Sequence, residues 1–234
     1  PAVIQAVTSQ ITHNIEQELK VLLLGDLIRL KNTDSQLLYK IGHDIVQQVA
    51  IEGLTPERKR QLHFSLAETL AEKVSLSENR SSSMEEAIAR HYLGASSIKA
   101  IPFVINAAKN LTNNYSFEHA LDLIDQAIAL EPALEPLISL LELNSKALIK
   151  TGHIPEGLRS IRRLRSVIGK SNLKMPIEVE LLEAKCHHEQ GRYAESSGIV
   201  DSLLERLDPV SEHDSYYECL GERIVLLVAR GETE

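Results

Sequence analysis

The chain has 234 residues, of which 43% are hydrophobic and 25% charged, and its formal net charge is −8. This composition is typical of a globular protein with one or two domains, and the negative charge argues against non-specific nucleic-acid binding by the whole surface. No apolar run approaches the roughly 20 residues of a membrane-spanning helix and no signal peptide opens the chain, so we expect a cytoplasmic protein.

The first predicted elements are a helix, two strands and a second helix. Apolar residues recur at helical spacing from about residue 8 to residue 24. Residues 27–30 and 36–41 have the pattern of short strands on either side of a polar turn, and another helix starts near His43. This order predicts the C-terminal part of a winged-helix-like linker domain, with a short β-hairpin, over residues 1–54.

The junction after these elements has a distinctive pattern. The run Tyr39-x-Ile41-x-His43-Asp44-Ile45-Val46 is followed by Gly53-Leu54-Thr55-Pro56-Glu57-Arg58-Lys59-Arg60. It resembles the junction in bacterial signal-transduction ATPases with numerous domains, which include maltose-regulon activator-type regulators and regulators linked to kinase or cyclase domains. The resemblance covers most of the chain and departs from the usual aromatic residue at Ile41. It implies an interdomain contact through His43, Asp44, Arg58, Lys59 and Arg60.

The same residues allow two other interpretations. His43 and Asp44 could act as a base and its orienting carboxylate, but their position at a helix start is typical of capping and packing. The basic run from Arg58 to Arg60 could contact nucleic acid. A recognition helix must carry side chains that read bases, however, and the helix predicted here offers Ile45, Val46 and Val49. We therefore do not expect DNA binding by this chain.

A long helix is predicted over residues 56–74, because proline is favourable in a first turn and leucines recur at helical spacing after it. Residues 77–83 have almost nothing to bury and predict a mobile loop. Met84–Leu93 then forms a short helix that ends at Gly94. These two helices make a degenerate first pair.

Residues 101–132 predict a second antiparallel helix pair with a break near residues 113–116. Their pattern of two small residues, an aromatic residue, two alanines and a proline resembles a tetratricopeptide repeat, and it is made by Ala107, Ala108, Phe117, Ala120, Ala127 and Pro132. A unit of this kind cannot bury its apolar face alone, so the resemblance implies that neighbouring helix pairs stack on it.

Three further segments continue the pattern: Leu137–Lys150 with Pro155–Ile168, Ile177–Gln190 with Ala194–Leu207, and a last helix at Ser215–Arg230. The corresponding break positions Phe117, Ile154 and Tyr193 are 37 and 39 residues apart. The predicted fold is therefore mostly α: a tetratricopeptide-like α-solenoid of antiparallel helix pairs over residues 55–234, with a truncated last repeat. Because the chain begins without methionine and its last repeat is incomplete, we expect a piece of a longer protein.

The sequence contains no strong catalytic motif. It has no G-x-x-x-x-G-K-[ST] loop for phosphate and no G-x-S-x-G turn for a serine nucleophile. The run Cys186-His187-His188 has zinc-binding residue types, but adjacent residues on a helix point about 100° apart, so a site needs ligands such as His213 and Cys219 from elsewhere. The two cysteines give no disulfide framework. We predict no catalytic residue, no metal site and no cofactor.

The strongest local charge cluster consists of Arg159, Arg162, Arg163 and Arg165. At helical spacing the first three lie on one side, opposite Leu158, Ile161, Leu164 and Ile168. One interpretation is a solvated face paired with nearby carboxylates. The other is a docking patch for an acidic partner or a phosphorylated ligand.

These patterns together favour a non-catalytic sensor or protein-interaction segment of a signalling or transcription-regulating ATPase, which binds a protein, a peptide or a small inducer. One alternative is a stand-alone helical scaffold or an oligomerisation module that uses the apolar run Ile224–Ala229. Another is an all-helical metal-dependent enzyme built around His187, His188 and His213.

Overall fold

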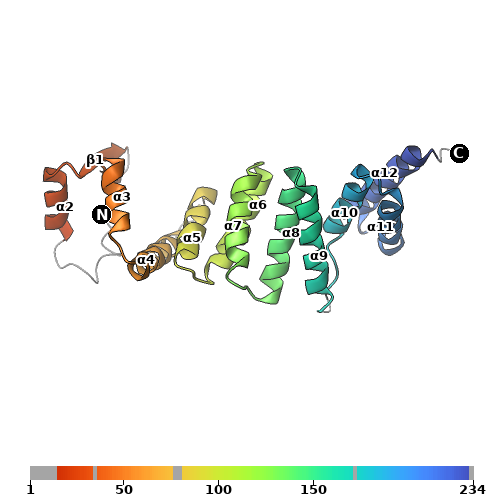
Figure 1. Cartoon of the computed structure of the whole chain (residues 1–234), viewed down its shortest axis with the longest axis horizontal. Helices are drawn as coiled ribbons and strands as arrows, with labels where there is room; N and C mark the ends of the chain where they lie inside the picture. Colours follow the sequence, from red (N-terminus) through yellow and green to blue (C-terminus); the bar gives the residue numbers. More distant parts are fainter. Residues whose placement is uncertain (1–14, 34–35, 76–80, 171–172, 232–234) are drawn as a thin grey trace. The chain divides into compact units, whose positions relative to one another are not determined.

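A computed structural model describes residues 15–33, 36–75, 81–170 and 173–231. Within these ranges the chain forms eleven helices and one two-stranded antiparallel sheet, so the protein is mostly helical, as predicted (Figure 1). The chain divides into two compact units, residues 1–107 and residues 108–234. The domain boundary predicted after residue 54 lies inside the first unit. No helix in the described ranges is long and apolar enough to cross a membrane.

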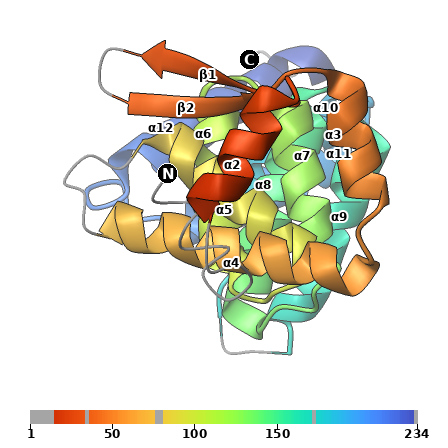
Figure 2. The same ribbon diagram turned by 90° about the vertical axis from the view of Figure 1, so that its left-hand side faces the viewer.

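The first unit opens with a helix, a hairpin and a helix: α2 (Ile15–Leu24), β1 (Ile28–Thr33), β2 (Gln36–Ile41) and α3 (Asp44–Glu52). The strands pair from Ile28 opposite Ile41 to Thr33 opposite Gln36 (Figure 2). The order of elements is the predicted one. The start of the first predicted helix and residues 34–35 of the predicted turn lie outside the described residues.

Neither α2 nor α3 has a buried residue within its bounds. Large apolar side chains are instead exposed on both helices: Val21, Leu24, Ile45 and Val49. Helices α2 and α3 therefore contribute no side chains to the buried core.

The next two helices are α4 (Pro56–Ser75) and α5 (Ser82–Gly94). The bounds of α4 agree with the prediction, whereas α5 begins two residues early and Ser82 and Ser83 are helical, not part of a loop. The reason is local: the carbonyl of Ser81 accepts a hydrogen bond from the amide of Met84 at 3.0 Å, which sets the helix start. Residues 77–80 of the predicted loop lie outside the described residues.

Two histidines meet where α4 packs on α5. His63 Nδ1 and His91 Nδ1 are 3.0 Å apart, and their ring centroids are 5.2 Å apart. One ring must donate the hydrogen while the other accepts it, so the pair is satisfied only while at least one imidazole is neutral. Burial lowers the pKa of His91, and the nearby charge of His63 lowers it further.

We expect acid to weaken this contact. The pKa of His91 is lower in the folded protein than in the unfolded chain, so the unfolded chain binds the proton more tightly. The stability from neutral His91 is therefore complete above the ordinary value of 6.5 and is lost as the pH falls from there through the lowered pKa of the folded protein. Urea midpoints of the natural chain should therefore be lower at about pH 5.5 than at about pH 7.5. His91→Gln, which does not titrate, should show a smaller difference. An equal difference in the variant would exclude His91 as the origin of the effect.

The second unit contains six helices after α6 (Ala100–Asn113), which runs across the boundary between the units. They are α7 (Phe117–Ile128), α8 (Leu134–Lys150), α9 (Ile154–Ile168), α10 (Ile177–Glu189), α11 (Tyr193–Arg206) and α12 (His213–Arg230). All of them were predicted, and the ends predicted for α8 to α12 lie within three residues of those observed. Consecutive pairs pack on each other, except that α9 and α10 make fewer contacts, and α10 also touches α8 and α12.

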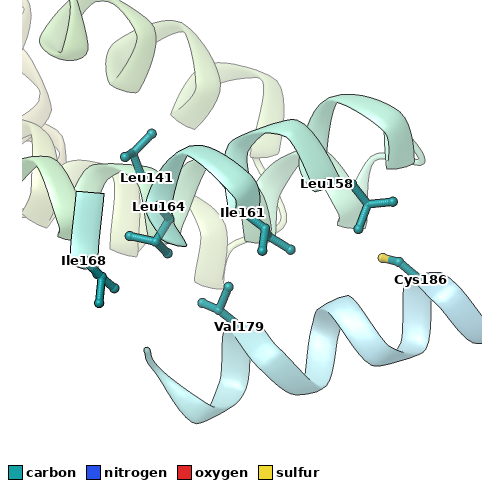
Figure 3. Packing of buried hydrophobic residues seen from close by; sticks show 7 residues of the cluster. All are labelled: Leu141, Leu158, Ile161, Leu164, Ile168, Val179 and Cys186. Carbon is teal, nitrogen blue, oxygen red and sulfur yellow. The ribbon is translucent and has the colours of Figure 1, made fainter. Parts of the chain in front are cut away.

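The described core of the second unit includes two clusters of buried side chains. The first lies between α9 and its neighbours and consists of Leu141, Leu158, Ile161, Leu164, Ile168, Val179 and Cys186 (Figure 3). The second joins α10, α11 and α12 and consists of Leu181, Ala184, Val200, Leu203, Leu207, Cys219 and Leu226. Because α10 supplies residues to both clusters, it is buried on two sides.

The breaks between helices share one backbone geometry. At each of three breaks a residue with positive φ, Tyr115 (60°), Gly152 (81°) or Gly191 (71°), ends the helix. The next amide then bonds to the carbonyl five residues earlier, as in Arg192 to His187 at 2.8 Å. This is the helix-ending motif that favours glycine. The predicted break positions therefore correspond to one another in structure.

Candidate functional site

The candidate site is built on α9, whose two faces differ sharply. Leu158, Ile161, Leu164 and Ile168 are buried, whereas Arg159, Arg162 and Arg163 are exposed. Helical spacing places a residue on the same face every three or four positions, which separates the apolar residues from the basic ones. The division of α9 into a core face and a basic face is the predicted one.

A pocket of about 310 Å³ lies where this basic face meets α10 and the break before α11. Its lining residues are Pro155, Leu158, Arg159, Arg162, Glu183, His187, Gln190 and Arg192. The lining residues from α9 are spaced three or four positions apart, and so are those from α10 together with Gln190. Each helix therefore presents one edge to the pocket. Three arginines and one glutamate give the lining a formal charge of +2 when His187 is neutral.

The arginines of the predicted cluster have different surroundings. Arg159 Nη2 donates to Glu156 Oε1 at 2.7 Å, with both side chains largely exposed. Arg165 Nη2 donates to Glu183 Oε2 at 2.6 Å, and its Nη1 lies 3.8 Å from the nearly buried Glu180. Among the described residues, Arg162 and Arg163 have no hydrogen bond or ion pair. Of these two, only Arg162 lines the pocket.

Arg165 is therefore part of a structural network and not of the pocket. Glu180 of α10 also accepts a hydrogen bond from Arg206 Nη2 of α11 at 2.5 Å. These two arginines supply the positively charged partners that a carboxylate with so little exposure requires. The predicted four-arginine patch thus separates into Arg159 and Arg162 at the pocket, Arg163 in solvent, and Arg165 between α9 and α10.

His187 lines the pocket and also has an unsatisfied polar atom. Its Nδ1 is buried and has no hydrogen-bond partner in the described structure. Burial lowers the pKa of His187 and the charge of Arg192 lowers it further, although Glu183 and Glu195 oppose this effect. The neighbouring Cys186 belongs to the core, where burial raises the pKa of its thiol to about 11. An inert thiol of this kind is a packing residue.

The sequence pointed to only half of this pocket. Gln190 and Arg192 were not singled out, and His187 was considered only as a metal ligand. Two signals were present: Glu183, His187 and Gln190 share one helical face, and Arg192 follows a helix-ending glycine. Neither signal identifies the opposite wall without the tertiary structure.

The residues predicted for an interdomain contact lie in the first unit. His43 is exposed at the N-cap of α3, makes no side-chain capping bond, and its Nε2 lies 3.9 Å from Asp26 Oδ2. Asp44 occupies the first turn of the helix. Arg58 donates to Gln61 Oε1 at 3.0 Å, and Arg60 pairs with Glu57 at 2.6 Å. Lys59 is half-buried.

Two of the three histidines of the alternative enzyme hypothesis, His188 and His213, have separate partners. His188 Nδ1 lies 3.1 Å from Glu222 Oε1, a carboxylate that is nearly buried on α12. His213 is exposed and lies 3.4 Å from Asp214. Within the described ranges, no group of three or more histidine, cysteine, aspartate or glutamate side chains is placed to hold a metal ion.

Two other surface features are less specific. A second pocket of about 300 Å³, lined by Tyr115, Ser116, Phe117, Glu118, His119 and Thr151, contains no lysine or arginine. The apolar run on α12 exposes Ile224, Val225, Leu227 and Val228, while Leu226 is buried. The basic pocket differs from both because three arginines line it.

Comparison of the chain with protein-family models, with curated proteins and with solved structures found no match.

Proposed function

We propose that this protein is a non-catalytic binding module that captures an anionic segment of a partner protein in the basic pocket. The observation that carries the proposal is the convergence of Arg159, Arg162 and Arg192 on a single pocket of about 310 Å³. Guanidinium groups form charge-assisted, often bidentate hydrogen bonds with carboxylate and phosphate groups. Arg162, which has no ion pair among the described residues, is the residue best placed to make them.

The wider setting is also a proposal. The helix pairs of residues 55–234 would be irregular tetratricopeptide-like repeats, and the helix-hairpin-helix before them would be the end of a winged-helix-like linker. The sequence pattern of residues 39–60, which resembles the domain junction of signalling ATPases, supports placement of this chain in an ATPase of that kind with several domains. Capture of the partner would then bias the attached ATPase between resting and active arrangements through a difference in affinity for the two.

Binding of a capped polyglutamate peptide tests this function. We expect Arg162→Gln to weaken binding by about tenfold, because a charge-assisted hydrogen bond is worth roughly 1.5–3 kcal/mol. Arg163→Gln is the matched control, since Arg163 is the next residue on α9, is exposed and does not line the pocket. Titration calorimetry at low and high salt measures both effects, and salt should weaken binding. Equal losses in the two variants, or no binding by any anionic peptide, would refute the proposal.

A further inference from the structure

We propose that the anion recognised by the basic pocket is a phosphomonoester dianion, carried by a phosphorylated serine or threonine of the partner protein. This inference rests on the proposed function and specifies its ligand. It depends on the charge of the pocket, on the directions from which its donors come, and on the place of His187 in the lining.

The charge of the lining matches a dianion better than a single carboxylate. Its one acidic residue, Glu183, is already engaged by Arg165 at 2.6 Å, and Arg159 has its own partner in Glu156 at 2.7 Å. Arg165, the partner of Glu183, and Glu156, the partner of Arg159, carry opposite charges. Counting both with the lining therefore leaves its formal charge at +2. A phosphorylated side chain carries about −1.5 to −2 charges near neutral pH, whereas a glutamate carries −1.

The donors reach the pocket from two sides. Arg159 and Arg162 come from α9, while Arg192 comes from the break before α11. Its side chain donates to the amide oxygen of Gln190 and, among the described residues, to no other group. A tetrahedral phosphoryl group offers three oxygens in different directions, and a planar carboxylate offers two. Pro155 and Leu158 supply apolar surface for the carbon atoms beside the ester oxygen.

The imidazole of His187 would bind a proton more readily when a dianion occupies the pocket. The charged groups that face it are Arg159 and Arg162 on α9, Glu183 on its own helix, and Arg192 and Glu195 on the next element. A dianion held between the arginines would oppose the effect of Arg192 and stabilise the imidazolium, whichever ring nitrogen faces the ligand. Ligand binding should therefore raise the pKa of His187, which burial and Arg192 lower in the free protein.

Four probes separate the possible ligands: a short capped peptide with one phosphoserine among alanines and glycines, the same peptide with serine, the same peptide with glutamate, and inorganic phosphate. We expect the phosphoserine peptide to bind at least about tenfold more tightly than the glutamate peptide, and the serine peptide not to bind. Arg162→Gln should remove most of this preference, whereas Arg163→Gln should change the affinity less than about twofold. Nuclear magnetic resonance of the His187 ring should show its pKa rising when the phosphoserine peptide saturates the protein.

Each other result has a definite meaning. If the glutamate peptide binds as tightly as the phosphoserine peptide and depends on Arg162, the inference is wrong and the proposed function stands. If inorganic phosphate binds as tightly as the phosphopeptide, the pocket is a free-phosphate site and the inference is wrong. If neither these peptides nor polyglutamate bind, both proposals fall. Binding that Arg162→Gln and Arg163→Gln weaken equally would overturn the assignment to this pocket.

Discussion

Replacing Ile161 with alanine is expected to lower the free energy of unfolding by about 2–5 kcal/mol. Ile161 has no exposed surface and lies at the centre of the first core cluster, on the face of α9 that meets Val179 of α10 (Figure 3). Removing three carbon atoms there loses their burial and leaves a cavity that fixed helices on both sides cannot fill. Urea unfolding followed by circular dichroism measures the change.

The matched control is Ile224→Ala on α12, where the side chain is 61% exposed. The same chemical change at an exposed position should alter stability by no more than about 0.5 kcal/mol. If Ile161→Ala were equally mild, α9 would not pack on its neighbours as described, and the wall of the basic pocket would lose its structural basis.

Replacing Gly157 with alanine is expected to destabilise the protein even though alanine is the better helix former. In an open helix this exchange gains about 1 kcal/mol. Gly157 is buried on α9, however, and an added Cβ would lie 2.4 Å from Cγ1 and 3.1 Å from Cδ1 of Ile149 on α8. Cγ1 is bonded directly to Cβ of Ile149, so it cannot move away unless the side chain changes its χ1 rotamer. Overpacking of this kind costs about 1–3 kcal/mol, which outweighs the gain in helix propensity.

Gly198→Ala provides the opposite expectation in the same unit. Gly198 lies within α11 and an added Cβ would meet no atom within 4 Å, so the substitution should stabilise the protein by up to about 1 kcal/mol. The sign of the change in urea midpoint distinguishes the two sites. If Gly157→Ala stabilised the protein, α8 and α9 would have to lie farther apart than they do in this structure.

The helices were predictable because their apolar residues recur at helical spacing and because glycine or proline marks most of their ends. Helix α9 is the clearest case, with its core residues on one face and its arginines on the other. Helix α10 is different: Val179 and Cys186 join one cluster while Leu181 and Ala184 join the other. Its two neighbours, and not its own periodicity, explain which of its residues are buried.

The pocket was predictable only in part, for a related reason. Arg159 and Arg162 were found because the clustering of arginines on one helix is a local property. Arg165 was assigned to the same patch, but it follows Ile161 by four residues and therefore lies on the side of α9 that meets Glu180 and Glu183. The opposite wall comes from residues more than twenty positions later in the chain. A single sequence does not indicate which of those residues lies opposite which arginine.

The two faces of α9 also separate the determinants of folding from the determinants of recognition. The residues that hold the helix in the core are Leu158, Ile161, Leu164 and Ile168, and all but Leu158 are absent from the pocket lining. Substitutions at the exposed positions 159, 162 and 163 therefore leave most of the packing untouched. If the proposed anion binding is real, its preference can change during evolution, from one anion to another or to none, without a matching loss of the fold.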